Sequence, residues 1–178
     1  MKNKIFFVLI AASLGLVACN ALKKLTQFRV NYGASFTIPS SILVNVPLDI
    51  LTPEMQTNIS QELENNNSSK ELIESVKLEE MRLTVASPAG QDFSFLKDIR
   101  LFISADGLAE KQIAYKENIP ENIGGEIVMD VIDEELKEYL KKDKITLRAV
   151  ATTDKLISQN VNVNVANRFF IDAKILGL

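Results

Sequence analysis

The chain contains one cysteine, Cys19, and no histidine. Ser-His-Asp and Cys-His nucleophilic systems need an imidazole base, so both are excluded, as is every metal site that uses a histidine ligand. A single cysteine also excludes an intramolecular disulfide and a CxxC zinc or redox site. The chemistry that remains open to this chain uses pairs of carboxylates, metal ions held by oxygen atoms, or a Ser-Lys dyad. A dyad around Ser68, Ser69 and Lys70 would lie in a loop where nothing buries the lysine and lowers its pKa, so we do not expect one.

Two groups of acidic residues have the spacing that carboxylate catalysis needs. A glycosidase places two carboxyl groups about 5–10 Å apart in a cleft. The candidates are Glu79 with Glu80, and Asp130 with Asp133, Glu134 and Glu135. The first pair also fits a solvated bulge, and the second group fits the acidic start of a helix. Because the chain has no tryptophan to stack against a sugar, we expect no catalytic residue and no enzymatic activity.

Acidic side chains are also candidates for calcium binding. The possible oxygen donors are Asp92, Asp98, Asp106, Asp130 and Asp133. None of them follows the D-x-[DN]-x-[DN]-G loop with a closing glutamate, and Asp106-Gly107 is typical of a turn. The seven glycines form no phosphate-binding motif. We therefore expect neither a metal ion nor a cofactor.

The balance of charges bears on nucleic acids. The chain has 20 basic and 23 acidic residues, a formal charge of −3. A protein that neutralises many phosphates needs a basic surface, so we expect no nucleic-acid partner.

The first nineteen residues have the pattern of an export signal. Lys2 and Lys4 precede an apolar stretch over residues 5–18, which is too short to span about 30 Å of hydrocarbon as a permanent helix. The stretch ends in Leu16-Val17-Ala18-Cys19. This ending resembles the lipobox of bacterial lipoproteins, in which a leucine three residues before the cysteine and small residues next to it precede the modified cysteine.

The resemblance implies that the modifying enzymes recognise Leu16, Val17 and Ala18, attach a diglyceride to the Cys19 sulfur and cleave after Ala18. A further fatty chain such as palmitate would then acylate the new N-terminus. An uncleaved N-terminal helix, or an ordinary signal peptide cut elsewhere, stays open as an alternative. Because Asn20 is not the aspartate that favours inner-membrane retention, the predicted location is the cell envelope, on the periplasmic side of the outer membrane.

The chain divides into three predicted parts. Residues 1–18 are the signal peptide, residues 19–25 a lipidated tether, and residues 26–178 a folded domain. The six residues from Asn20 to Leu25 reach only about 20 Å when fully extended, so the domain is expected close to the membrane. Lys23 and Lys24 in the tether are either solvated or in contact with anionic head groups.

Strict alternation of apolar and polar residues dominates the chain from residue 26. Because short alternating segments separated by turns indicate antiparallel strands with one buried face, the predicted fold is mostly β: an antiparallel β-sandwich of about seven to nine strands. The alternating segments are 28–38, 42–50, 76–85, 99–103, 127–131, 145–149 and 160–173. A one-residue phase slip at Glu79-Glu80 predicts a β-bulge.

Helical patterns are scarce. One short helix is predicted near 133–142, where acidic residues begin and lysines end the segment. Residues 53–64 and 69–75 have weaker helical patterns. Residues 65–69 between them, with the sequence Asn-Asn-Asn-Ser-Ser, are predicted to be a polar loop with nothing to pack against.

The run of alternating asparagine and valine over residues 160–165 is unusual. Its valines are expected in the core. Its asparagines fit either a solvated face or a sheet edge that accepts a partner strand. The pattern from Leu78 onward resembles small extracytoplasmic β-sandwich lipoproteins and the sandwich of the late-embryogenesis-abundant type 2 class, a resemblance that assigns no function.

The sequence thus leads to two main classes of function, beside a third, a small assembly or biogenesis factor, which an exposed apolar patch of several hundred Å² would indicate. The first is a non-enzymatic binding or accessory module, held at the membrane by its N-terminal lipid and directed at another envelope protein. The alternative is a carbohydrate-interacting protein, either a glycan-binding module or a hydrolase that uses two carboxylates.

Overall fold

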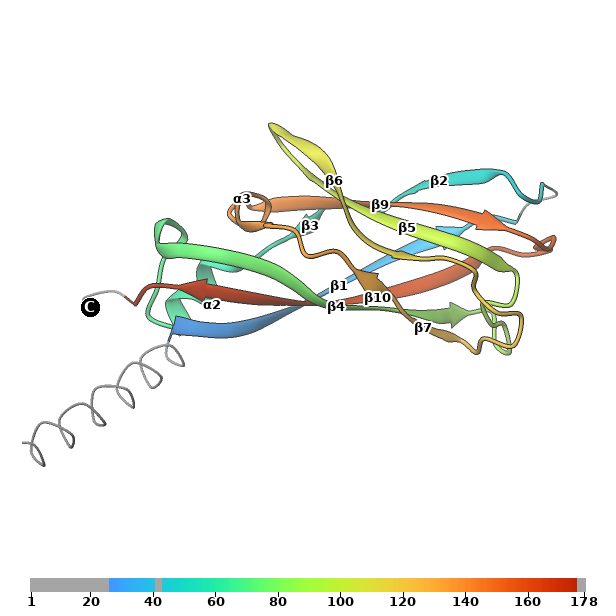
Figure 1. The fold of residues 1–178 in the computed structure, drawn as a ribbon, viewed down its shortest axis with the longest axis horizontal. Coiled ribbons are helices and arrows are strands. Elements are labelled where there is room, and N and C mark those ends of the chain that lie inside the picture. The colour runs from blue at the N-terminus through green and yellow to red at the C-terminus, as the bar shows by residue number, and fades with distance from the viewer. Residues whose placement is uncertain (1–25, 41–42, 176–178) are drawn as a thin grey trace, which may run out of the picture.

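The computed structural model describes residues 26–40 and 43–175. Ten strands form two antiparallel sheets that face each other in an elongated sandwich (Figure 1). This confirms the predicted antiparallel β-sandwich. The predicted number of strands corresponds to the eight that have three or more residues.

The first sheet contains four strands. Their order is β1 (Gln27–Ile38), β10 (Val161–Ala173), β4 (Ile73–Ser87) and β7 (Glu126–Val128). β1 pairs with β10 along its whole length without a register shift. β10 therefore lies inside the sheet, and β1 forms one of its two edges.

The second sheet contains six strands. Their order is β2 (Pro47–Leu51), β9 (Lys144–Thr153), β5 (Leu96–Ala105), β6 (Leu108–Lys116) and β8 (Asp130–Val131), with β3 (Met55–Gln56) also on β9. The alternation over 42–50 predicts a longer β2 than the structure has. Asn45 adopts a left-handed conformation with φ 58°, which interrupts an extended chain.

Residues 126–131 join the two sheets along one side. β7 pairs with β4 in the first sheet, whereas β8 pairs with β6 in the second. Between these strands the Met129 N–H donates to the Met81 carbonyl at 2.9 Å. This crossing closes one side of the sandwich, so the edges formed by β1 and β2 lie on the other side.

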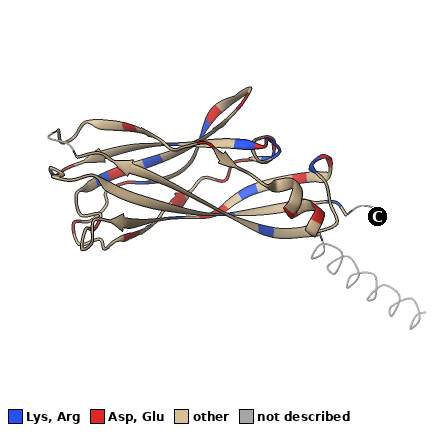
Figure 2. Ribbon diagram, turned by 180° about the vertical axis from the view of Figure 1, so that it is seen from behind, with Lys and Arg blue, Asp and Glu red and all other residues tan. Residues whose placement is uncertain are grey.

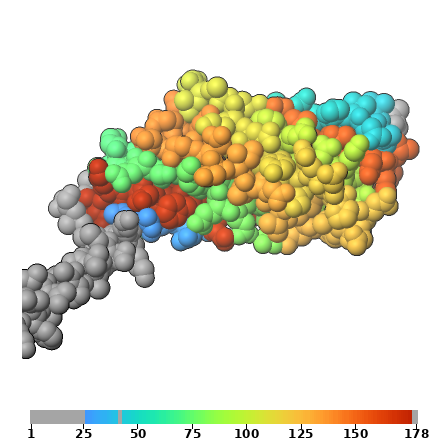
Figure 3. All heavy atoms as spheres, in the orientation of Figure 1, coloured from blue at the N-terminus to red at the C-terminus, as the bar shows by residue number. Residues whose placement is uncertain are grey.

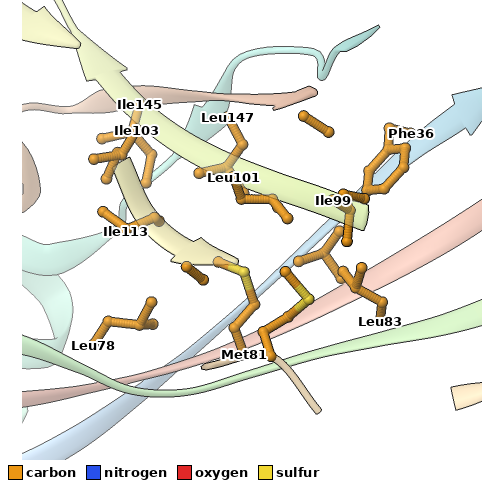
Figure 4. Close-up of a cluster of buried hydrophobic side chains, with 14 of the residues drawn as sticks. Phe36, Leu78, Met81, Leu83, Ile99, Leu101, Ile103, Ile113, Ile145 and Leu147 are labelled. Atoms are coloured by element: carbon orange, nitrogen blue, oxygen red, sulfur yellow. The ribbon is translucent and has the colours of Figure 1, made fainter. Parts of the chain in front are cut away.

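The core fills the space between the sheets with aliphatic side chains from both (Figure 4). Each such side chain stabilises the fold by about 1.5–3 kcal/mol through its removal from water. Members that are at most 4% exposed include Leu78, Met81 and Leu83 of β4, Ile99, Leu101 and Ile103 of β5, and Ile145 and Leu147 of β9.

The predicted β-bulge is confirmed. Arg168 of β10 pairs with Glu80, but the next residue, Phe169, pairs with Leu78. Glu79 is therefore the additional residue in β4. The bulge lets Leu78 and Met81 both face the core although three positions separate them.

The helix predicted over 133–142 is wrong for most of its length. The structure has only α3 (Lys137–Leu140) there. The preceding residues are bound to the edge of β4, where the Leu136 N–H donates to the Val76 carbonyl and the Glu135 carboxylate accepts from the Val76 N–H. These contacts hold the segment away from helical dihedral angles until Leu136.

The weaker helical patterns are confirmed only in part. Within 53–64, the structure has the strand β3 and then α2 (Ile59–Asn65); within 69–75, it has the 3₁₀ turn η1 (Lys70–Leu72). The loop at 65–69 does pack: Ser68 is 2% exposed and donates to the Lys174 carbonyl at 2.7 Å. Among the residues described, no helix combines the length and apolarity that crossing a bilayer requires.

Candidate functional site

The predicted lipidation site lies outside the residues that the structure describes. Leu16, Val17, Ala18 and Cys19 precede Thr26, where the description begins. β1 starts at Gln27, eight residues after Cys19. The start of β1 lies at the same end of the sandwich as α2 and the last residues of β10 (Figure 1).

Glu79 and Glu80 are held in ion pairs on the outer face of the first sheet. Arg29 of β1 donates two hydrogen bonds, of 2.7 and 2.8 Å, to the Glu79 carboxylate. Arg82 donates to Glu80 at 3.0 Å, and Arg168 contacts both carboxylates. The hydrogen bond from Arg29 holds the pKa of Glu79 below its ordinary value, and that from Arg82 does the same for the pKa of Glu80.

This arrangement does not suit a general acid. A glycosidase acid must hold its proton near neutral pH, which requires a raised pKa. Glu79 and Glu80 are instead kept ionised by arginines that belong to the same face. Their geometry is that of a network that ties three neighbouring strands together, β1, β10 and β4.

The second acidic group is divided among separate partners. Asp130 contacts Lys116 at 3.3 Å, Asp133 contacts Lys77 at 2.9 Å, and Glu134 contacts Lys111 at 2.9 Å. Burial raises the pKa of the Glu135 carboxyl, but hydrogen bonds from Val76, Ser75 and Lys137 outweigh this effect and leave that pKa below its ordinary value. The four carboxylates are not gathered around a common cleft.

The candidate calcium ligands also fail to come together. Asp92 accepts a hydrogen bond from the Ser94 N–H at 2.9 Å, and Asp106 precedes Gly107, whose φ of 73° makes the turn between β5 and β6. Within 26–40 and 43–175, no three acidic side chains cluster as a metal-ligand set. Acidic and basic residues lie interspersed on both sheets (Figure 2).

The asparagines of the 160–165 run form an exposed row on the outer face of β10, as one of the two interpretations predicts. Thr37 donates to the Asn162 side chain at 2.7 Å, which in turn donates to Ser87 at 2.7 Å. The other interpretation, an edge that accepts a partner strand, is wrong. β10 already has β1 on one side and β4 on the other.

The long free edge of the first sheet is β1. Beside its centre lies an open depression of about 450 Å³. Gly33, Ala34 and Ser35 of β1, with Asn164 and Val165 of β10, line one side of the depression. The segment 53–55, which leads into β3, lines the other. Sequence reasoning missed this edge because alternation identifies a strand but does not give its place in the sheet.

A second surface feature is a set of exposed aliphatic side chains on two connections at the opposite end from the start of β1. We call it the apolar tip: Leu43 (54% exposed), Val44 (37%), Val46 (44%) and Leu156 (66%). The β1–β2 and β9–β10 connections meet there, with Asn45 N–H donating to the Thr153 carbonyl at 2.6 Å (Figure 3). Clusters of exposed apolar side chains mark interaction sites.

The similarities to known proteins are distant. No family model and no curated protein matches the chain. Among solved structures, the decameric BFDV capsid protein is 8% identical with a TM-score of 0.37, covering 83% of this chain and 98% of its own. CpGH89CBM32-5 from Clostridium perfringens, in complex with GalNAc-β-1,3-galactose, is 10% identical with a TM-score of 0.36, covering 81% and 97%.

A third similar structure is the C-terminal domain of a chitobiase from Bacteroides fragilis. It is 14% identical with a TM-score of 0.32, covering 74% of this chain and 66% of its own. At these identities and TM-scores, the three likenesses establish no relationship to this chain. They do not transfer a ligand, an assembly or an activity to this chain.

Proposed function

We propose that this protein is a lipid-anchored β-sandwich of the bacterial cell envelope that acts as a non-enzymatic binding or accessory module. The observation that carries the proposal is the tetrapeptide Leu16-Val17-Ala18-Cys19, which follows an apolar leader and stands eight residues before β1. Because so few residues separate Cys19 from the start of the folded domain, a lipid on Cys19 would hold the domain close to the membrane.

The physics of acyl chains supports a stable anchor. Each buried methylene contributes about 0.8 kcal/mol, and two or more chains hold a protein at a bilayer where one chain does so only marginally. Extended over eight residues, the connection from Cys19 to Gln27 reaches about 26 Å. The sandwich therefore stays beside the bilayer, which we place on the periplasmic side of the outer membrane.

Two features favour binding over catalysis. The acidic groups that are candidates for catalysis are occupied by arginine, lysine and backbone partners. The apolar tip, in contrast, exposes aliphatic side chains to solvent, of which Leu156 is the most exposed. An uncharged aliphatic surface suits an apolar pocket on another envelope protein.

The alternative is a carbohydrate-interacting protein. The exposed asparagine row offers amide groups that can bond sugar hydroxyls. The depression beside β1, however, has no aromatic side chain among its lining residues to stack against a sugar ring. We therefore rank glycan binding second.

The anchor is tested by intact-mass analysis of the protein purified from bacterial envelopes. We expect an N-terminus at Cys19 that carries a diglyceride and a fatty acyl chain. The Cys19→Ser variant is expected to keep its leader and carry no lipid, whereas the Asn20→Gln control is processed normally. An intact leader on the native protein, or lipid on the serine variant, would contradict the proposal.

The binding role is tested with the acylated protein in detergent-solubilised envelopes. We expect a reproducible protein partner whose recovery depends on the apolar tip. The same preparation is applied to an array of envelope glycans and to chromogenic glycosides. Glycan binding without a protein partner supports the alternative, and measurable turnover overturns the non-enzymatic role.

A further inference from the structure

The free edge of β1 lacks several of the features by which proteins usually protect an edge strand. Edge strands are commonly short, bulged, or interrupted by lysine or proline. β1 has twelve residues, pairs with β10 without a bulge, and contains Arg29 as its only charged residue. Outside its pairing with β10, no backbone–backbone hydrogen bond from 27–38 to another described residue is formed.

The hydrogen bonds of β4 show which residues of β1 direct their N–H and C=O groups toward the free edge, because the pattern can be followed from β4 through β10 to β1. The Val85 N–H donates to Gly125, and the Met81 carbonyl accepts from Met129, so the backbone groups of these odd-numbered residues point toward the β7 side. In an antiparallel strand, successive residues point their N–H and C=O groups to opposite sides. Arg82, which pairs with a residue of β10, therefore directs its groups toward β10.

The same alternation carries through β10 to β1. Ala166 pairs with Arg82 and bonds toward β4, so its neighbour Val165 bonds toward β1. Val165 is opposite Ala34, which leaves Gly33 with its N–H and C=O directed to the free edge. The residues of β1 with backbone groups at the free edge are thus Gln27, Arg29, Asn31, Gly33, Ser35 and Thr37.

We propose that this edge pairs with the same edge of a second copy of the chain. The two β1 strands run antiparallel around a twofold axis that passes between Gly33 of one copy and Gly33 of the other. Pairing joins the two four-stranded sheets into one continuous sheet. An open depression lies beside Gly33, between β1 and the segment 53–55.

The outward side chains of β1 are compatible with this register. Asn31 lies opposite Ser35 of the second copy, and Arg29 lies opposite Thr37. Like charges directly opposite each other would destabilise a cross-strand pair, and this register contains no such pair. Arg29 also has its charge compensated within its own copy by Glu79.

The inward side chains match by size. Tyr32 lies opposite the small side chain of Ala34 in the second copy, and Val30 lies opposite Phe36. All four residues contribute to the apolar interior or pack against it. The pairing forms about ten new backbone hydrogen bonds, because each directly bonded residue pair exchanges two. A second copy of β1 has outward polar and inward apolar side chains at the matching positions by symmetry. An unrelated strand would match these positions only by chance.

The lipid anchors are compatible with the pairing in one orientation. Antiparallel strands of twelve residues place the two β1 starts about 40 Å apart. Both anchors reach one bilayer if the long axis of the dimer lies along the membrane surface. This step rests on the proposed lipid anchor, whereas the strand pairing does not.

Disulfide cross-linking tests the register in the full chain purified in detergent. The Cys19→Ser background removes the only native thiol and the lipid, so pairing is tested separately from anchoring. We expect Gly33→Cys to give a disulfide-linked dimer, because the two Cα atoms of this bonded pair lie about 5.5 Å apart. An added Cβ at Gly33 meets only the Val165 carbonyl oxygen, at 4.0 Å.

Two matched variants complete the cross-linking test. Ser35→Cys alone is expected to stay monomeric, because the two copies of position 35 are about 13 Å apart along the strands. Asn31→Cys combined with Ser35→Cys restores the dimer. If Gly33→Cys stays monomeric, or if Ser35→Cys cross-links as efficiently, the proposed register is wrong.

Amide hydrogen exchange of the unsubstituted chain keeps the proposal testable if a cysteine variant does not fold. Pairing protects the N–H groups of Arg29, Asn31, Gly33, Ser35 and Thr37, and dilution to the monomer exposes them. The even-numbered amides of β1 stay protected in both states. Rapid exchange at the five odd positions at high protein concentration, together with a monomer mass by sedimentation, would overturn the proposal.

Discussion

Tyr32 and Asn167 lie directly opposite each other in the β1–β10 pair, and each has a buried polar atom without a hydrogen bond to any described residue. The atoms are the Tyr32 hydroxyl oxygen and the Asn167 Oδ1. Asn167 is only 3% exposed, and the Tyr32 ring packs edge-on against Phe169 with ring centroids 5.8 Å apart. A buried polar group without a partner costs about 1–3 kcal/mol, so this pair is a weak point of the core.

Tyr32→Phe is expected to raise the free energy of unfolding by about 1 kcal/mol, because it removes an unpaired buried hydroxyl and keeps the ring. Tyr139→Phe is the matched control, since the Tyr139 hydroxyl donates to the Ala109 carbonyl at 2.6 Å. The control is expected to lower stability by about the same amount. Urea unfolding measures both, and a destabilised Tyr32→Phe would show that the hydroxyl has a partner in solution.

Alkaline pH provides an independent prediction for the same side chain. Burial raises the pKa of the Tyr32 hydroxyl above its ordinary value of about 10. The unfolded chain therefore ionises first as the pH rises through about 10, and stability falls from there upward. Tyr32→Phe is expected to have a shallower loss of stability between pH 9 and pH 11, as far as the fold survives. Parallel curves for the two proteins would contradict the burial of the hydroxyl.

Acid pH tests the arginine network on the outer face. The hydrogen bond from Arg29 lowers the pKa of Glu79 in the folded state. The stabilisation from this interaction is therefore fully present above the pKa of about 4.3 that a glutamate has in the unfolded chain. It is lost as the pH falls through the lower pKa of the folded state. Glu79→Gln is therefore expected to lose less stability than the native protein between pH 6 and pH 3. Glu138→Gln, outside the network, serves as the control and should follow the native curve.

The alternation of side chains predicted the class of fold because it depends only on which face of a strand is buried. It predicted β4 with its bulge, since the slip at Glu79 is visible in the order of residues. It did not predict that β10 is central and β1 peripheral. That order is decided by contacts between residues more than a hundred positions apart, such as Thr37 with Asn162.

Local patterns also failed where tertiary contacts compete with them. The segment 133–142 has an amphipathic pattern, but Glu135 and Leu136 form hydrogen bonds with the backbone of Val76 in β4 instead of a first helical turn. Asn167 continues a row of asparagines in sequence, yet it lies on the inner face because the row changes phase after Val165. The candidate carboxylates were identified by type, whereas their neutralising partners come from distant strands.

The role of Glu135 can be measured directly. Glu135→Ala removes the acceptor for the N–H groups of Val76 and Lys137 and for the Ser75 hydroxyl. We expect a loss of about 1 kcal/mol, less than a fully buried charged hydrogen bond contributes, because the Glu135 side chain is only partly removed from water. Amide exchange at Val76 and Lys137 should accelerate, whereas Glu138→Ala leaves it unchanged. An unchanged rate in Glu135→Ala would show that the strand edge alone holds this segment.

A substitution in the apolar tip distinguishes a role in binding a partner from a role in stabilising the fold. Leu156→Ser is expected to leave the free energy of unfolding within about 0.5 kcal/mol, because the side chain is 66% exposed. Recovery of the envelope partner should nevertheless fall at least about tenfold if the leucine fills an apolar pocket, which corresponds to about 1.4 kcal/mol of binding free energy. Leu51→Ser is the matched control, since Leu51 is 70% exposed but lies at the far end of β2 from the tip. Equal recovery with both variants would place the partner's contact elsewhere on the sandwich.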